Sequence, residues 1–147
     1  MQQRIENRKA RFEFEIVETY EAGIELLGPE TRSIRLGRAD LSGAYIIVRG
    51  GEVFLVNMRI TSTQPNNPSA EFDEMRNRRL LLNKSEIRRI AAALDRDGLT
   101  AIPLTIFQNK HRFKVELAVA TRRKTHDKRQ LLKKRDDERD MRRATKR

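Results

Sequence analysis

A mainly β fold is predicted for this chain: a small, closed barrel of antiparallel strands with two or three peripheral helices and a basic C-terminal tail. Three observations support it. Residues 12–26 alternate between apolar and polar side chains, which indicates a strand with one buried and one solvated face. Further β-rich runs are joined by turn-forming residues. Beyond Ala120 the apolar pattern stops and the chain becomes strongly charged.

The strand predicted over 12–26 is about twice the usual length. Its alternation breaks once, at Val17 and Glu18, as expected for a bulged strand that is shared between the two sides of a barrel. The polar, basic residues 2–10 before it are expected to be an arm that either contacts phosphates or is disordered.

A short helix is predicted to start at residues 28–30, Gly-Pro-Glu, because Pro suits the first helical position and Glu suits the positive end of the helix dipole. Arg32, Arg35 and Arg38 recur every third residue, so we expect them on one helix face. Gly37 is the expected end of the helix.

Residues 42–48 and 53–60 are two further predicted strands, and the central Gly50-Gly51 predicts a hairpin because both residues can take positive φ. Residues 61–70 contain two prolines and no apolar period, which predicts a mobile loop.

The clearest helix is predicted to follow Asn83, which forms a capping box with Glu86 and precedes apolar residues at helical spacing. Gly98 is expected to end it. Residues 99–107 and 112–120 then give two more strands. Five or six antiparallel strands that close on themselves indicate an OB-like barrel, a fold that often binds oligonucleotides but does not by itself determine function.

The predicted division is a barrel over 1–120 and a basic tail over 121–147. The tail has only Leu131, Leu132 and Met141 as large apolar residues. Burial of these cannot offset an ordering cost of about 1–2 kcal/mol per residue, so we expect the tail to be disordered alone and helical when docked.

Charge indicates a polyanionic partner. The net charge is +11, of which residues 121–147 carry +8, and a small basic protein of this kind most often meets nucleic acid. A solvated tail without specificity is the alternative. The absence of Cys and of paired His argues against disulfides and metal sites. No long apolar run or signal-peptide core is present, so a soluble cytosolic protein is expected, without contact to membranes.

Catalytic motifs are missing from the sequence: it has no glycine-rich phosphate loop and no nucleophile elbow. The glutamates of the first strand alternate with apolar residues and are better explained as its solvated face. We therefore expect no enzyme, no cofactor and no metal. Tyr20 and Tyr45 are expected in the core, whereas His126, inside a basic run, is either solvated or stacked on an exposed base.

Seven short segments, in this order and at this spacing, resemble the SsrA-binding protein family, small protein B. They are Asn7–Ala10, Glu18–Ile24, Glu30–Arg35, Arg79–Lys84, Gly98–Leu104, Lys114–Leu117 and His126–Arg129. The resemblance implies an OB-like barrel that binds the tRNA-like domain of transfer-messenger RNA (tmRNA). It also implies delivery of that RNA to the A site of ribosomes stalled on non-stop mRNA, with the tail in the decoding centre and the empty mRNA channel.

The family's RNA-binding positions correspond to Glu21, Leu81 and Lys114, with Asn7, Arg35 and Asn83 as further candidates. Structural explanations stand beside these: Leu81 as core, Asn83 as a helix cap and Glu21 as an exposed strand face. In the tail the resemblance assigns Lys124, His126, Asp127, Lys128 and Arg129 to the decoding centre and mRNA channel.

The implied partners are tmRNA, the small ribosomal subunit and, indirectly, elongation factor Tu with aminoacylated tmRNA, and the protein is expected to be a monomer. One departure from the family lies at the junction of barrel and tail, where Arg122 replaces the usual Gly and removes hinge freedom. The alternatives are a general OB-type RNA-binding or ribosomal protein and, third, a module that binds an acidic protein.

Overall fold

The computed structural model describes residues 4–63 and 72–145. Its strands are β1 (Arg4–Glu6), β2 (Phe14–Ile24), β3 (Ala39–Asp40), β4 (Tyr45–Arg49), β5 (Glu52–Val56), β6 (Arg59–Ile60), β7 (Arg78–Leu81), β8 (Thr100–Asn109) and β9 (Arg112–Arg122). Its helices are α1 (Arg8–Glu13), α2 (Gly28–Arg35), α3 (Lys84–Asp95) and α4 (Thr125–Thr145).

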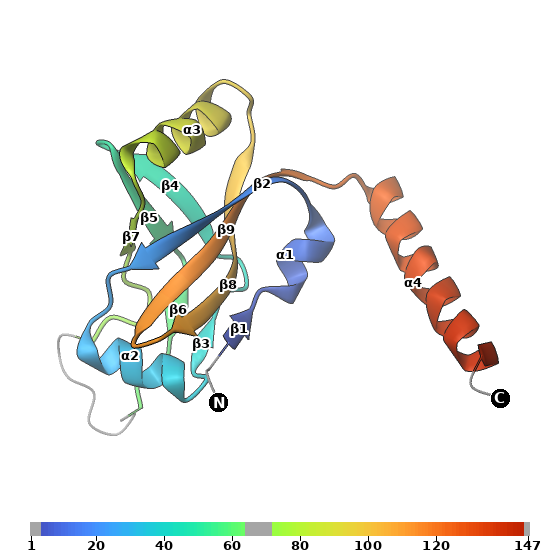
Figure 1. Ribbon diagram of the computed structural model, residues 1–147, viewed down its shortest axis with the longest axis horizontal. Coiled ribbons are helices and arrows are strands. Elements are labelled where there is room, and N and C mark those ends of the chain that lie inside the picture. Colours follow the sequence, from blue (N-terminus) through green and yellow to red (C-terminus); the bar gives the residue numbers. More distant parts are fainter. Residues whose placement is uncertain (1–3, 64–71, 146–147) are drawn as a thin grey trace.

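Seven of these strands form one sheet that closes on itself. The strand order is β1-β8-β4-β5-β7-β2-β9, and β9 also pairs with β8, so that six strands make a ring to which β1 is added (Figure 1). All pairings are antiparallel. The predicted mixed fold, mainly antiparallel β with peripheral helices, is confirmed; the ring contains six strands, and β3 and β6 form a separate short pair.

The long strand β2 carries the predicted bulge. Its register with β9 shifts between Ile16 and Glu18, and Val17 is left 58% exposed. The strand starts later than expected because residues 8–13 form α1, whose first turn is capped by Asn7. Of the two alternatives for residues 2–10, disorder is therefore wrong for the described residues 4–10, which form β1 and the start of α1.

The β4–β5 hairpin turns at Gly50 and Gly51, whose φ values of 60° and 76° confirm the predicted use of glycine. Most of the loop predicted over 61–70 lies outside the described residues. Strand β7 was not predicted, because three consecutive leucines hide an alternation in which Leu80 is buried and Leu81 is 46% exposed.

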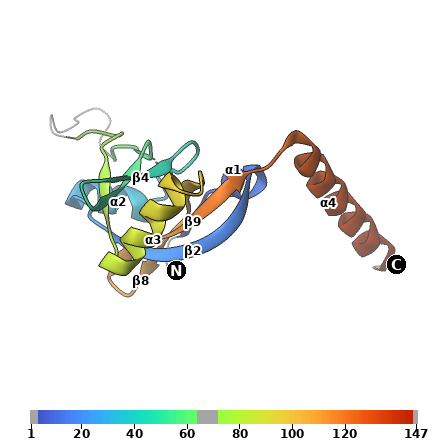
Figure 2. The ribbon, with the colours of Figure 1, turned by 90° about the horizontal axis from the view of Figure 1, so that it is seen from above.

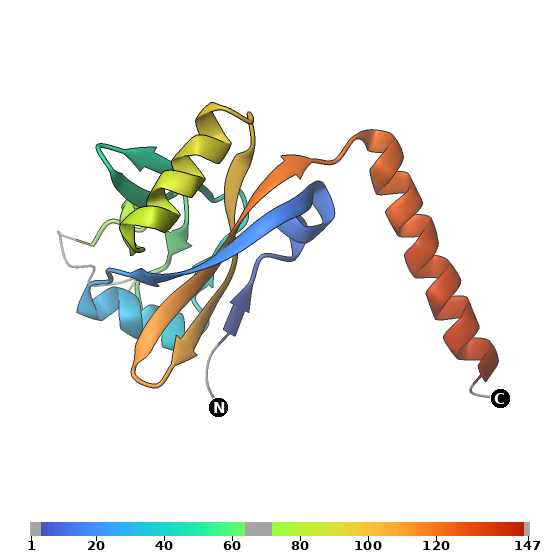
Figure 3. The same cartoon turned by 45° about the horizontal axis from the view of Figure 1, so that its top comes forward.

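The main core fills the inside of the ring and is covered at opposite ends by α2 and α3 (Figures 1 and 3). Each helix contributes a fully buried isoleucine, Ile34 from α2 and Ile90 from α3. Tyr20 belongs to this core as expected, whereas Tyr45 is 44% exposed and does not. Helix α2 ends at Arg35, so Arg38 lies beyond it and does not share its face, contrary to the expectation.

Two features describe the region where the tail was predicted to begin. Strand β9 continues to Arg122, two residues past the predicted boundary, because Thr121 and Arg122 still pair with β2. The following segment is the helix α4, which stands apart from the sheet in all three views (Figures 1–3). Its sequence contains neither Gly nor Pro and is rich in good helix formers, which suits a helix, and Leu132 and Met141 stay exposed.

Candidate RNA-binding surface

A buried ion pair holds the elements that frame the candidate surface. Glu30 of α2 is 1% exposed and Arg78 of β7 is 0% exposed. Arg78 Nε donates to Glu30 Oε2 at 2.8 Å, and Arg78 also donates to the carbonyl oxygen of Met58 at 2.6 Å. Arg76 donates to the other oxygen, Glu30 Oε1, at 2.6 Å. These contacts tie α2 and β5–β6 to β7 and thereby fix the strand that carries Leu81.

Electrostatics favour the charged form of this carboxylate. Burial alone would raise the pKa of Glu30, but hydrogen bonds from Arg76, from the Leu27 backbone N–H and from Arg78 outweigh burial and lower the pKa. The Leu27 N–H lies 2.9 Å from Glu30 Oε1, so the same carboxylate also caps the start of α2. The sequence predicted a dipole role for Glu30; its ion pairs depend on the tertiary structure.

Glu21, Leu81 and Lys114 come together on the outer face of the sheet. Lys114 Nζ lies 3.0 Å from Glu21 Oε1, and both side chains are partly exposed. Gly23 on β2 separates Lys114 on β9 from Leu81 on β7, since it is paired in register with both. The structural explanation of Leu81 as a core residue is wrong, because its side chain faces solvent.

Leu81 and Lys114 border one cavity of about 350 Å³, together with His111, Arg112 and Thr31 of α2. A Cβ at Gly23 would lie 3.3 Å from Leu81 Cβ, so a larger residue at this position would make Leu81 shift by a few tenths of an ångström. His111 and Arg112 were not among the predicted site residues. The signal available in the sequence was the basic cluster Lys110-His111-Arg112 at a turn, two residues before Lys114.

Asn83 is the N-cap of α3, as its structural explanation states. Its Oδ1 accepts from the Glu86 backbone N–H at 2.9 Å and from the Ser85 hydroxyl at 2.7 Å. In turn, the Asn83 backbone N–H donates to Glu86 Oε1. Its side chain is nevertheless not buried and lies two residues after Leu81. The cap therefore accounts for the hydrogen bonds of the Asn83 side-chain oxygen. Contact between Asn83 and RNA stays a prediction.

Asn7 lies elsewhere and is only 4% exposed. Its Nδ2 donates to the carbonyl oxygens of Leu41 and Pro103, and its Oδ1 accepts from the Ala10 N–H at 3.2 Å. These bonds use the oxygen and both amide hydrogens. Asn7 thus anchors α1 to the sheet, and this geometry gives it a structural role; its contact with RNA stays a prediction.

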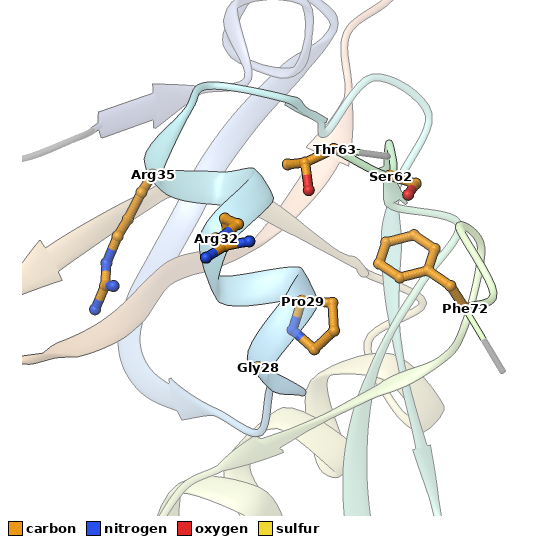
Figure 4. A pocket seen from close by; sticks show the side chains of 7 residues that line it. All are labelled: Gly28, Pro29, Arg32, Arg35, Ser62, Thr63 and Phe72. Carbon is orange, nitrogen blue, oxygen red and sulfur yellow. The ribbon is translucent and has the colours of Figure 1, made fainter. Parts of the chain in front are cut away.

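Arg35 is not part of the Glu21–Leu81–Lys114 surface. It borders a second cavity, of about 470 Å³, with Arg32, Phe72 and Thr63. Figure 4 shows Phe72 facing Pro29 at the start of α2, while the side chain of Arg35 points away from them. Helix α2 thus separates two cavities, with Thr31 at one and Arg35 at the other.

The predicted tail residues lie at the start of α4. Lys124 precedes the helix, and His126, Asp127, Lys128 and Arg129 lie in its first turns. The His126 ring is exposed, and its Nε2 lies 3.1 Å from Gln130 Nε2, one turn further along. No second aromatic residue lies in the described part of α4, so its chemistry is that of a cationic helix.

Among the described residues, no group of His, Cys, Asp or Glu side chains is arranged to hold a metal ion. No helix among the described residues has the length and apolar character that crossing a membrane requires.

Comparison with known proteins identifies the family. The sequence profile described as SmpB protein matches residues 4–147. An SsrA-binding protein of Thermosynechococcus vestitus is 47% identical over 96% of this chain and 93% of its own length, and one of Chlorobium phaeovibrioides is 49% identical over 95% and 88%. A solved structure described as "tmRNA-SmpB: a journey to the center of the bacterial ribosome" contains a chain 40% identical to this one, with a TM-score of 0.70 over 84% of this chain and 86% of that one. This chain therefore belongs to the SmpB family of SsrA-binding proteins.

Proposed function

We propose that the protein is a non-enzymatic RNA-binding factor of trans-translation, working in the cytoplasm as a monomer. It binds the tRNA-like domain of tmRNA and delivers it to the A site of ribosomes stalled on non-stop mRNA. Its partners are tmRNA, the small ribosomal subunit and, through aminoacylated tmRNA, elongation factor Tu. No cofactor takes part.

One observation carries the proposal: in a chain of this family, Glu21, Leu81 and Lys114 form one accessible surface although they come from three different strands. The surface offers what a folded RNA needs. Lys114 supplies a cation for phosphate, Leu81 an apolar contact for a base or ribose, and Glu21 an acceptor for base or 2′-hydroxyl donors. Asn83 lies two residues after Leu81, Arg35 borders the second cavity across α2, and Asn7 anchors α1 to the sheet.

The tail carries the second half of the function. Helix α4 stands apart from the closed sheet, and its basic first turns, with Lys124, His126, Asp127, Lys128 and Arg129, are free to enter the decoding centre and the mRNA channel. The chain thus divides into an RNA-binding body and a basic helix, with the boundary just after β9.

The alternative function is that of a general OB-type RNA-binding or ribosomal protein. Selectivity for a tRNA-like RNA distinguishes the proposed function from this alternative. We expect the purified protein to bind the tRNA-like domain of tmRNA more tightly than an unstructured RNA of equal length at the same salt concentration. Fluorescence anisotropy of the two labelled RNAs measures this difference. Equal affinity for both RNAs would favour the alternative, and no RNA complex at physiological salt would favour an acidic protein partner.

Lys114→Ala tests the surface itself. We expect weaker binding of the tRNA-like domain and a plot of log affinity against log salt that is flatter by about one unit, since one phosphate contact is lost. Arg59→Ala is the control, because Arg59 is an exposed strand cation on β6, which is not part of the seven-stranded sheet that carries this surface. An unchanged slope for Lys114→Ala would show that Lys114 is not at a phosphate.

A further inference from the structure

We propose that the RNA-binding surface continues past Lys114 onto β8 and β1, where Phe107 stacks an unpaired base and Arg4 contacts a neighbouring phosphate. This inference rests on the proposed function, because the RNA is the same one. It names two residues outside the predicted site and an orientation for the RNA strand.

Strand register places these residues in one row across five strands. Leu81 pairs with Gly23, Gly23 with Lys114, Lys114 with Phe107, and Phe107 with Arg4. Residues opposite one another in a sheet point to the same face. The two anchors of the candidate site, Leu81 and Lys114, therefore belong to the same row as Phe107 and Arg4.

The row faces outward, as its neighbours show. One residue further along three of the strands, Val115, Ile106 and Ile5 form the next paired positions. Val115 and Ile106 are fully buried, and Ile5 packs against the same core. Because side chains alternate between the two faces of a strand, Lys114, Phe107 and Arg4 must lie on the outside.

Phe107 is an aromatic residue without a place in the core. It is half-buried and belongs to neither hydrophobic cluster. The guanidinium of the exposed Arg4 lies 6.0 Å from its ring centroid, at the outer limit of a cation–π contact. A contact this long and solvated is weaker than a base–aromatic stack, so a base can take the ring face and leave Arg4 to a phosphate.

Spacing suits a single RNA strand. Neighbouring strands lie about 4.8 Å apart, so Lys114 and Arg4, two strands apart, are separated by about 10 Å at the backbone. An aromatic ring midway between two cations is the pattern that single-stranded nucleic acids use, with the base on the ring and phosphates at the cations. Folded tRNA-like RNAs present such unpaired bases in their loops.

The adjacent outward row sets the direction of the strand. Glu21 pairs in register with Glu116, which pairs with Thr105, which pairs with Glu6; Thr105 is 1% exposed, so the accessible members of this row are the three glutamates. Glu21 is paired with Lys114 and Glu116 with Arg11, but three carboxylates on this side still make it less favourable for phosphates than the basic turn, and they can accept hydrogen bonds from base or ribose donors. On the other side lies the basic β8–β9 turn at Lys110 and His111. The RNA backbone is therefore expected toward the turn, and the base edges toward the glutamate row.

The test uses the full chain and the labelled tRNA-like domain of tmRNA. We expect Phe107→Leu to weaken binding about tenfold with an unchanged salt slope, because stacking is not electrostatic. Phe107→Tyr keeps the ring and is expected to bind like the wild type. Arg4→Gln is expected to weaken binding and to flatten the salt slope by about one unit.

Matched controls exist outside the row. Phe54 is also half-buried, lies outside both core clusters and pairs in register with an arginine, Arg79, so Phe54→Leu repeats the change at a position that is not part of the row. Arg59→Gln likewise repeats the loss of an exposed strand arginine. Thermal unfolding of each variant confirms that the body remains folded, and binding is compared at a temperature well below every midpoint.

Three results would overturn the inference. If the wild type binds the tRNA-like domain but Phe107→Leu binds no worse than Phe54→Leu, the row ends at Lys114 and the proposed function stands. If Phe107→Leu flattens the salt slope, Phe107 only positions Arg4 and does not stack a base. If the wild type shows no preference for the tRNA-like domain, the proposed function fails and this inference fails with it.

Discussion

Glu30 shows how much a single side chain organises in this fold. Its carboxylate caps α2 through the Leu27 N–H and neutralises Arg78, which is itself bonded to the Met58 carbonyl oxygen. A buried charge is tolerated only with such partners, because removal from water is costly. Arg78 belongs to β7 and lies on its buried face, whereas Leu81 lies on its exposed face, so the pair supports the position of Leu81 without being part of the candidate RNA surface.

We expect Glu30→Gln to destabilise the protein by about 3–5 kcal/mol, because it leaves Arg78 buried without a countercharge. Urea unfolding followed by circular dichroism measures this loss. Glu25→Gln is the control: Glu25 also pairs with an arginine, Arg79 at 3.4 Å, but both side chains are about half exposed, and the expected change is below about 1 kcal/mol. Equal losses for the two variants would mean that the buried pair contributes no more than a surface pair.

The lowered pKa of Glu30 also predicts a pH dependence. The folded protein keeps this carboxylate charged at a pH where the unfolded chain, with a pKa near 4.5, already binds a proton. The stabilisation is therefore complete above the unfolded pKa and is lost as pH falls through the folded pKa. We therefore expect the free energy of unfolding of Glu30→Gln to fall less between neutral and acidic pH than that of the wild type, when urea unfolding is measured at each pH.

At the scale of elements, α3 is the helix whose start combines two roles. Asn83 closes a capping box with Glu86 and directly follows the strand that carries Leu81. The cap sets where α3 begins, and α3 in turn covers one end of the core through Ile90. A change at Asn83 can therefore act on helix stability, on RNA binding or on both.

Two substitutions separate these roles. Asn83→Ala removes the cap and should cost about 1 kcal/mol in the free energy of unfolding, whereas Asn83→Asp keeps a capping oxygen and should leave stability nearly unchanged. Both variants are then measured for binding to the tRNA-like domain. If Asn83 contacts RNA, Asn83→Asp binds more weakly because it replaces an amide donor with a negative charge. Wild-type binding by Asn83→Asp would restrict Asn83 to its capping role.

At the scale of the whole molecule, the junction between body and tail is firmer than the sequence indicated. The Arg122 guanidinium lies 5.3 Å from the ring centroid of Phe14, and the Arg123 N–H donates to the Glu13 carbonyl oxygen at 2.8 Å. The body thus holds the chain as far as Arg123, which leaves very few residues before α4 begins at Thr125. Tail movement must arise from this short link.

This geometry defines the truncation that separates the two halves. A chain ending at Lys124 keeps all of β9, whereas one ending at Ala120 loses two residues that pair with β2. We expect the Lys124 truncation to bind the tRNA-like domain nearly as well as the full chain but to abolish tagging on stalled ribosomes, measured in a reconstituted translation assay. Equal loss of both activities would contradict the division of labour between body and tail.

Local patterns were enough for several elements. The alternation in β2 with its break at Val17, the Gly50-Gly51 turn and the capping box at Asn83 were all predicted and are confirmed. Each depends on residues close together in the chain, whose backbone preferences act without long-range partners. Strand β7 was not predicted, because its outward residue, Leu81, is as apolar as its inward neighbour Leu80 and the sequence therefore shows no alternation.

The sequence by itself determined the class of fold, the family and the candidate residues Glu21, Leu81 and Lys114, because these follow from local periodicity and from motifs in a fixed order. Only the tertiary structure decided which candidates share a surface. The register across β7, β2, β9, β8 and β1 brings Leu81, Lys114, Phe107 and Arg4 into one row. Asn7, in contrast, is buried and anchors α1. The physical reason is that strand pairing joins residues far apart in the chain, and no local preference records which residues will face each other.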